Sequence, residues 1–296
     1  MTWSLVAVDT DGREAVAASD SNGQLYVMDA LPAGSRLIDI IRDWDRHAPA
    51  LQRWTINGAV PLKGAKVLQP LRYPSKLLCI GVNYRDHRQE MNADVNAPKA
   101  TPFFFFKPPT TALIGPGEDI LIRTVEDRVD WEAEVAIVIS RGGRFIKRED
   151  ALSHIAGVTL VNDISARGVH HRANAVHEAF AYDWVASKAQ DGFCPIGPGI
   201  VPIWQIADLG DIDFQLTVNG KVEQSSNTGL MITAILDQVV AASEWVTLES
   251  GDVIATGTPS GVGAPRGLFL KEGDEVEVSA PLLGKLKNKI ALQPRV

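Results

Sequence analysis

The sequence predicts a mixed fold that is mostly β. Short apolar runs bounded by Gly, Pro and Asn recur along the chain, and Asn219-Gly220 separates two of them by the two residues of a tight hairpin. Helical periodicity is rare by comparison. Because helices do not alternate regularly with the strands, we do not expect a doubly wound parallel sheet.

The N-terminal part predicts a small α+β domain. Strands are expected over residues 3–8 and 24–28. Ser35 can cap a helix whose apolar positions follow helical spacing, namely Leu37, Ile40, Ile41 and Trp44. Pro49 is the expected end of this helix, since proline interrupts the backbone hydrogen-bond ladder.

A proline-containing stretch marks the predicted domain boundary. Pro61, Pro70 and Pro74 lie in a stretch with little periodicity, which is typical of a linker. We therefore divide the chain into a small domain, residues 1–72, and a larger strand-rich domain, residues 73–296.

The larger domain is dominated by strand patterns. The expected strands cover residues 77–82, 103–106, 132–139, 157–164, 214–218, 252–255, 275–279 and 286–292, and a hairpin partner begins at Lys221. One long helix is expected after Asn227-Thr228, with an apolar stripe formed by Ile232, Ile235, Val239 and Val246.

The composition excludes several classes of protein. The 296 residues carry a formal net charge of −7 without a basic run, so nucleic acids and anionic membranes are not expected partners. No apolar stretch approaches the ~18 residues of a membrane helix, and the first nine residues lack the basic head of a signal peptide. Cys79 and Cys194 are expected to be reduced packing residues, which favours a cytoplasmic protein.

Three acidic residues form a candidate metal site. Glu132 and Glu134 project to the same face of the expected strand, because side chains two residues apart do so. Asp163 ends an apolar strand, where a carboxylate is unfavourable unless it is paired or bound to a metal. Three carboxylates suit Mg²⁺ or Mn²⁺ better than Zn²⁺. The alternative is an exposed strand face that carries the glutamates, with Asp163 in a turn.

A histidine and a glutamate form a candidate acid–base pair. His87 and Glu90 are three residues apart after the strand over 77–82, so they share a face if this segment is a short helix. A carboxylate beside an imidazole orients it as a general base. The alternative is an exposed, charged helical turn.

Three other segments are less specific. Lys188 and Asp191 lie in a Pro/Gly-rich stretch, where the lysine is either solvated or holds an oxyanion or the attacking water. The glycine loop over 256–263 matches no nucleotide-binding pattern, and it is either a plain turn or a source of backbone N–H groups for a carboxylate. Three histidines lack metal-ligand spacing and are expected on the surface or in a lid, namely His170, His171 and His177.

Six segments together resemble the fumarylacetoacetate hydrolase family, in particular its branch of acylpyruvate hydrolases and 2-hydroxyhepta-2,4-diene-1,7-dioate isomerases. They occur in the family's order within residues 73–296, and they are Ile80–His87, Phe103–Pro108, Val129–Glu134, Val161–Arg167, Cys194–Pro198 and Gly251–Gly263.

The resemblance implies a β-rich catalytic core behind a small N-terminal domain, a homodimer and a bound Mg²⁺ or Mn²⁺. The implied metal ligands are Glu132, Glu134 and Asp163. The implied catalytic residues are His87, Glu90 and Lys188. The implied substrate contacts are Arg85, Asp191 and Thr258.

The reaction implied by the resemblance is metal-assisted hydrolysis of a carbon–carbon bond in a 1,3-diketo acid of the acylpyruvate or fumarylpyruvate type. His87, oriented by Glu90, would take a proton from water, and Lys188 would stabilise the oxyanion beside a Lewis-acidic metal. The same site could instead decarboxylate or isomerise a 2-oxo dicarboxylic acid. A metal-stabilised binding protein without turnover is the non-enzymatic alternative.

The sequence also departs from the family pattern. Gly168 stands where members often have Asp, and Lys188-Ala-Gln-Asp191 replaces the usual Lys-Ser-Phe-Asp. The stretch between Arg167 and Lys188 is longer than usual. Since this stretch is expected to cover the site, the identity of the substrate stays open.

Overall fold

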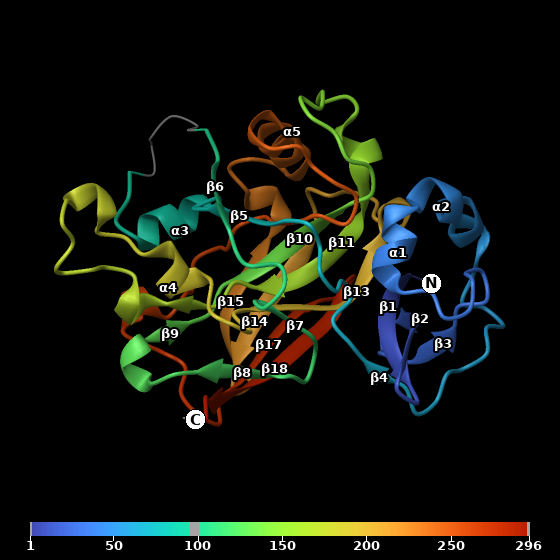
Figure 1. The fold of residues 1–296 in the computed structure, drawn as a ribbon, viewed down its shortest axis with the longest axis horizontal. Coiled ribbons are helices and arrows are strands. Elements are labelled where there is room, and N and C mark those ends of the chain that lie inside the picture. The colour runs from blue at the N-terminus through green and yellow to red at the C-terminus, as the bar shows by residue number, and fades with distance from the viewer. Residues whose placement is uncertain (1, 95–100, 295–296) are drawn as a thin grey trace.

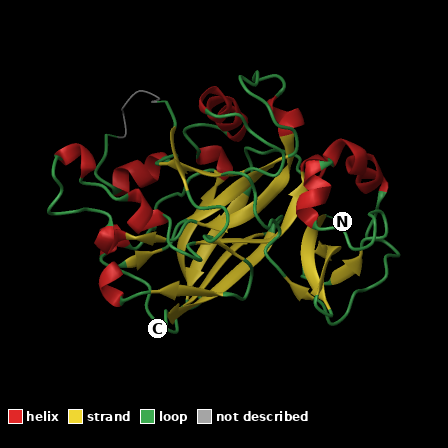
Figure 2. Ribbon diagram, in the orientation of Figure 1, coloured by secondary structure: helices red, strands yellow, loops and turns green. Residues whose placement is uncertain are grey.

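The computed structural model describes residues 2–94 and 101–294, in which two large sheets are flanked by helices (Figures 1 and 2). The larger sheet has eleven strands in the order β3-β2-β1-β13-β11-β10-β16-β5-β6, with β4 beside β1 and β7 beside β13. Its strands are β1 (Trp3–Thr10), β2 (Arg13–Asp20), β3 (Leu25–Val27), β4 (Lys66–Val67), β5 (Leu77–Gly81), β6 (Phe103–Phe106), β7 (Leu113–Ile114), β10 (Ala133–Ile139), β11 (Ile155–Asn162), β13 (Cys194–Pro202) and β16 (Val253–Ala255).

A second sheet has five strands in the order β15-β14-β17-β18-β8, and two short strands, β9 and β12, pair separately. These strands are β8 (Asp119–Ile122), β9 (Val129–Asp130), β12 (Ser165–Ala166), β14 (Asp213–Val218), β15 (Lys221–Asn227), β17 (Glu275–Ala280) and β18 (Gly284–Leu292). The α-helices are α1 (Leu37–Arg42), α2 (Trp44–Arg53), α3 (Arg85–Glu90), α4 (Trp184–Lys188) and α5 (Ile235–Trp245). The predicted mostly β fold is confirmed.

Strand β10 is the centre of the core, and every one of its side chains is buried. Ala133 and Val135 join the apolar cluster between the two sheets, whereas Ile137 and Ile139 pack against α5. The opposite face of β10 joins a third cluster, which includes the apolar side of α1. Because both faces of the strand are covered, its sequence is nearly continuous in apolar residues, and the two glutamates at its start are exceptions.

The predicted hairpin is confirmed at Asn219-Gly220. These residues have φ angles of +50° and +79°, the left-handed values that a two-residue turn of this kind requires. Val218 pairs with Lys221 directly beside the turn, which fixes the register of β14 against β15.

Several predicted boundaries are wrong. Pro49 lies inside α2 instead of ending the helix. A proline has no N–H to donate to the carbonyl four residues earlier, and here that carbonyl belongs to Asp45, which is exposed. Helix α5 begins at Ile235, because Ile232 lies in an extended segment whose N–H donates to the carbonyl of Asn83. Strand β13 was not predicted, since its prolines and glycines are typical of loops.

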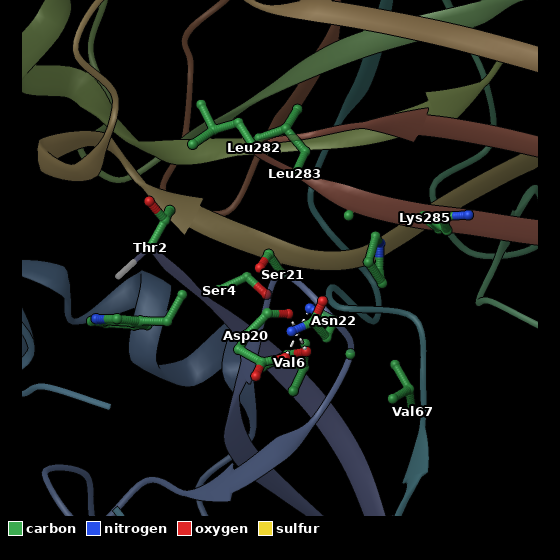
Figure 3. A pocket seen from close by; sticks show the side chains of 15 residues that line it. Thr2, Ser4, Val6, Asp20, Ser21, Asn22, Val67, Leu282, Leu283 and Lys285 are labelled. Atoms are coloured by element: carbon green, nitrogen blue, oxygen red, sulfur yellow. Dashed lines mark hydrogen bonds between the residues drawn. The ribbon is translucent and has the colours of Figure 1, made fainter. Parts of the chain in front are cut away.

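The N-terminal strands continue the main sheet. Leu5 of β1 pairs with Ile200 of β13, and Trp44 of α2 stacks on Trp204 with ring centroids 5.5 Å apart. A hollow of about 350 Å³ lies at this junction, and Figure 3 shows Leu282 and Leu283 across it from β1 and β2. The division of the chain at residue 72 stays a prediction. No helix in the described part of the chain is long and apolar enough to cross a membrane.

Candidate metal and acid–base site

Three buried carboxylates meet where β10 begins and β11 ends. Glu132 immediately precedes β10, Glu134 is its second residue and Asp163 follows β11. The pairing of Ala133 with Asn162 sets this register, and the N–H of Asp163 donates to the carbonyl of Glu132 at 2.8 Å. One oxygen from each carboxylate lies within 4.8 Å of the others. The alternative of an exposed glutamate face is therefore wrong.

Two lysines reach this carboxylate cluster (Glu132, Glu134 and Asp163). Nζ of Lys188 donates to Oε2 of Glu132 at 2.9 Å and to Oδ2 of Asp163 at 2.7 Å. Lys107, which is fully buried after β6, donates to Oδ1 of Asp163 and, at 2.9 Å, to the carbonyl of Ile164. These bonds use two of the three protons on each ammonium group, so each lysine keeps one donor that has no acceptor in the described part of the chain.

An arginine and a fourth carboxylate extend the network. Arg167 donates through Nε to Asp130 at 3.1 Å and through a terminal nitrogen to Glu132 at 2.5 Å. Asp130 is fully buried and also accepts the backbone N–H groups of Gly263 at 2.6 Å and Ala264 at 3.1 Å. The buried carboxylates of Asp130, Glu132 and Asp163 thus each have a cationic partner, as burial of a charge requires.

The two glutamates differ in their electrostatics. Burial opposes ionisation of Glu132, but the charges of Lys188 and Arg167 outweigh burial and hold its pKa below the usual value. Burial raises the pKa of Glu134 well above the usual value, and the charges of Asp163 and Glu132 raise it further. Glu134 therefore keeps its proton to a higher pH than a free glutamate, unless a cation takes the place of that proton.

The donor set fits a divalent cation. Oε1 of Glu134 is buried and has no hydrogen-bond partner among the described residues, whereas Oε2 accepts the N–H of Gly257 at 2.7 Å. In this network, four carboxylates face the three cations of Lys107, Lys188 and Arg167. Hard oxygen ligands are those that Mg²⁺ and Mn²⁺ prefer. A divalent ion would give Glu134 a partner and make the local net charge positive, which favours an anionic substrate.

The candidate acid–base pair forms on α3. Nδ1 of His87 lies 3.2 Å from Oε2 of Glu90, and the imidazole is buried. Oε1 of Glu90 accepts the N–H of Gly261 at 3.0 Å. Because Glu90 engages Nδ1, the other ring nitrogen, Nε2, remains for proton transfer. The alternative of an exposed helical turn is wrong for His87, and its partner Glu90 is held by the same glycine loop that binds Glu134 of the carboxylate cluster.

The glycine loop over 256–263 follows β16 and holds the protein's own carboxylates. Its backbone N–H groups bind Glu134 through Gly257, Glu90 through Gly261 and Asp130 through Gly263. The sequence predicts that this loop can bind a carboxylate, and the carboxylates that it binds are side chains of the protein itself. The loop fastens the carboxylate cluster and the His87–Glu90 pair to one segment.

The remaining predicted residues differ in where they lie. Thr258 is buried, and its hydroxyl donates to the carbonyl of Ala133 and accepts from Gln224, both at 2.9 Å. Arg85 is exposed at the first position of α3. Asp191 is exposed and lines a different hollow, beside Asp119 and Arg123. The structure does not bring Asp191 to the carboxylate cluster, and a substrate contact by Arg85 stays a prediction.

Sequence reasoning missed three charged residues of the network, Lys107, Arg167 and Asp130. Lys107 ends an apolar strand just as Asp163 does, so the same rule about charges at buried strand ends could have found it. Arg167 and Asp130 carry no such signal, because they meet only when β9 pairs with β12.

The fold and site together define an enzyme of the fumarylacetoacetate hydrolase superfamily. Residues 76–291 match the family described as "Fumarylacetoacetate (FAA) hydrolase C-terminal". The chain therefore belongs to the fumarylacetoacetate hydrolase family, and the predicted family and branch are confirmed.

Three known proteins illustrate the range of similarity. The chain is 40% identical over 233 residues to the mitochondrial oxaloacetate tautomerase FAHD2A of Bos taurus, covering 78% of this chain and 71% of that protein. It superimposes on a fumarylacetoacetate hydrolase from Exiguobacterium antarcticum with a TM-score of 0.82, at 31% identity and covering 99% and 100% of the two chains. Maleylpyruvate hydrolase from Sphingobium sp. SYK-6, in complex with manganese(II) and pyruvate, gives a TM-score of 0.76, at 26% identity and covering 98% and 100%.

These comparisons leave two expectations untested. The homodimer stays a prediction. So does the cytoplasmic location, since the bovine relative is described as mitochondrial.

Proposed function

We propose that this protein is a divalent-metal-dependent enzyme that interconverts the keto and enol forms of a 2-oxo dicarboxylic acid, the class to which oxaloacetate belongs. The observation that carries the proposal is the 40% identity over 233 residues to an oxaloacetate tautomerase. The buried His87–Glu90 pair near three carboxylates supports it, because proton transfer next to a carbonyl needs a base and charge stabilisation.

The proposed metal is Mg²⁺ or Mn²⁺, held by Glu132, Glu134 and Asp163. When bound, it supplies Lewis acidity to the 2-oxo group of the substrate. Arg167 and Lys107 hold Glu132 and Asp163 from outside the cluster, so that the carboxylates keep their orientation.

In the proposed reaction, Nε2 of His87 takes a proton from C3 of the keto acid. The C–H electron pair becomes the C2–C3 double bond, and the carbonyl π pair moves to the 2-oxo oxygen. Glu90 keeps the proton on Nδ1 and stabilises the imidazolium that forms, and Gly261 holds Glu90 in place. The third donor of Lys188 is directed to the developing oxyanion. The His87 imidazolium then returns its proton, directly or through a water molecule, to that oxygen, which gives the enol and restores the neutral imidazole; the reverse steps restore the keto acid.

A second candidate is the hydrolysis of a carbon–carbon bond in a 1,3-diketo acid. It is favoured by the likeness to maleylpyruvate hydrolase, which covers 98% of this chain, whereas the alignment with the tautomerase covers 78%. In that reaction His87 takes a proton from water, and the hydroxide adds to the carbonyl farther from the acid. The bond between that carbon and C3 then breaks, its electron pair forms the enolate of the 2-oxo acid, and the His87 imidazolium protonates the enolate. Decarboxylation of oxaloacetate at the same site is the remaining alternative for the assay to detect.

The test follows enol absorbance with oxaloacetate and with acetylpyruvate, with added Mg²⁺ or Mn²⁺ and then with excess EDTA. We expect metal-dependent acceleration of keto–enol relaxation for oxaloacetate, with the total acid conserved by mass. Metal-dependent release of acetate and pyruvate from acetylpyruvate would instead support hydrolysis. Loss of CO₂ would support decarboxylation, and no reaction with either acid would contradict both candidates.

The matched variants are His87→Asn and His154→Asn. Loss of the proposed base should lower kcat by roughly 10²–10⁴-fold while leaving metal binding and thermal unfolding unchanged. His154 lies outside the site, where its ring bonds the carbonyl of Arg141, so its variant should retain activity. Unchanged turnover in His87→Asn would show that His87 is not the base.

A further inference from the structure

A separate hollow is lined in part by residues of α3 and α4, two helices that lie at the other end of the molecule from α1 and α2 (Figure 1). Its volume is about 580 Å³. The walls come from the end of β5, from α3 and the turn after it, from the start of β6 and from the segment before α4. We call it the α3–α4 pocket. Most of the exposed wall is apolar, with Met91, Phe103, Tyr182 and Trp184 among its residues.

An aromatic ladder joins this pocket to the carboxylate cluster. The ring of Trp184 lies 5.2 Å from that of Phe103 and 5.1 Å from that of Phe105. Phe103 and Trp184 line the pocket, whereas the ring of Phe105 lies 5.2 Å from Nζ of Lys188, which binds the carboxylates. Trp184 and Lys188 also lie one turn apart on α4, so the pocket lies close beside the carboxylate cluster.

Arg88 is the unmatched charge of the pocket. It follows His87 on α3 and is half-buried, and no carboxylate or carbonyl in the described part of the chain binds its guanidinium. Asp94, which also lines the pocket, already has a partner. Burial lowers the pKa of His170, and the charges of Arg167 and Lys188 lower it further, so its ring is neutral at pH 7. An unpaired guanidinium in an apolar wall favours a carboxylate.

We propose that the α3–α4 pocket receives the far end of the substrate and that Arg88 binds a carboxylate there. This inference rests on the proposed function, which places the 2-oxo acid group at the carboxylate cluster. A substrate that spans both places must have a longer chain than oxaloacetate, because the chain has to pass the aromatic ladder to reach Arg88. Arg88 sets specificity and takes no part in the proton transfer.

The test uses two acids of equal length, 2-oxoadipate and 2-oxohexanoate, which differ only in the far carboxylate. Their binding to the full-length, Mn²⁺-loaded protein is measured by titration calorimetry. We expect the wild type to bind the diacid roughly tenfold or more tightly than the monoacid. Arg88→Gln should remove this preference by weakening the diacid alone, and Arg88→Lys should restore part of it. Arg53→Gln, at the exposed end of α2, is the matched control.

Equal affinity of the wild type for the two acids would overturn the inference. An equal loss of affinity for both acids in Arg88→Gln would also overturn the inference. Thermal unfolding of this variant is measured alongside. The oxaloacetate assay separates this result from the proposed function. Turnover of oxaloacetate without a preference for the diacid would support the proposed function and refute the pocket assignment. A preference for the diacid that depends on Arg88, without turnover of oxaloacetate, would support the pocket assignment and refute the proposed function.

Discussion

At the scale of single residues, the metal site depends on one carboxylate whose bonding is incomplete. Gly257 holds one oxygen of Glu134, and the other oxygen is buried with no partner within residues 2–94 and 101–294. Burial raises the pKa of Glu134, and the charges of Asp163 and Glu132 raise it further. A cation that binds this oxygen must displace a proton, so metal uptake is coupled to pH.

We therefore expect the apparent affinity for Mg²⁺ or Mn²⁺ to rise with pH until Glu134 is ionised, with about one proton released per ion. Calorimetry in buffers of different ionisation enthalpy measures this release. Glu134→Gln should bind the metal at least roughly tenfold more weakly and lose the proton release. Glu149→Gln, at an exposed position, should match the wild type. An affinity that does not change with pH would refute this coupling.

The residues that could be predicted are those with a local signal. Glu132 and Glu134 share a strand face, and His87 and Glu90 share a helical turn, so spacing alone relates the members of each pair. Arg167 and Asp130 are distant in the sequence, and only the pairing of β9 with β12 brings them together. A single sequence carries no information about such a pairing, which is why these residues were missed.

At the scale of elements, the glycine loop after β16 couples α3 to β10. Gly261 has a φ of +101°, and a Cβ atom on it would lie 2.1 Å from the carbonyl oxygen of Glu223. Its N–H supports Glu90, the partner of His87. A larger residue at this position would clash with β15, so the loop can hold Glu90 in this way only with glycine at 261.

Gly261→Ala should displace the loop and lower kcat by roughly tenfold or more, because the His87–Glu90 pair loses its support. KM should change less than kcat. The matched control is Gly267→Ala, where φ is +66° and nothing lies within 4 Å of the added Cβ. That variant should lose about 1 kcal/mol of stability and keep its activity. Similar kinetics in the two variants would exclude a positioning role for the loop.

Helices, strands and turns could be predicted where the local sequence determines their conformation. The Asn219-Gly220 hairpin was found from its turn alone, because the two residues have the left-handed angles that such a turn needs. Strand β13 was missed, because it contains Pro195, Pro198 and Pro202, which remove N–H donors from the ladder. It pairs with β11 across a register shift between Val158 and Leu160, and tertiary packing, not propensity, maintains this strand.

At the scale of the whole molecule, the N-terminal strands and the larger sheet share one set of backbone hydrogen bonds. Leu5 pairs with Ile200 and is fully buried, in the same apolar cluster as Ala136 and Val138 of β10. The cluster that stabilises the first strands therefore also packs against the strand that carries Glu134. A continuous core of this kind favours cooperative unfolding, even if the chain divides at residue 72.

Leu5→Ala tests this coupling across the junction. Removing its buried methyl groups should lower the free energy of unfolding by roughly 2–5 kcal/mol, whereas Leu152→Ala, at a position 49% exposed, should change it by less than about 0.5 kcal/mol. We expect thermal unfolding followed by far-ultraviolet circular dichroism and by release of bound Mn²⁺ to give coincident transitions in both variants and in the wild type. If Leu5→Ala instead melts in two steps, with Mn²⁺ retained after the first, the first 72 residues unfold as an independent domain. The site then does not depend on them for its stability.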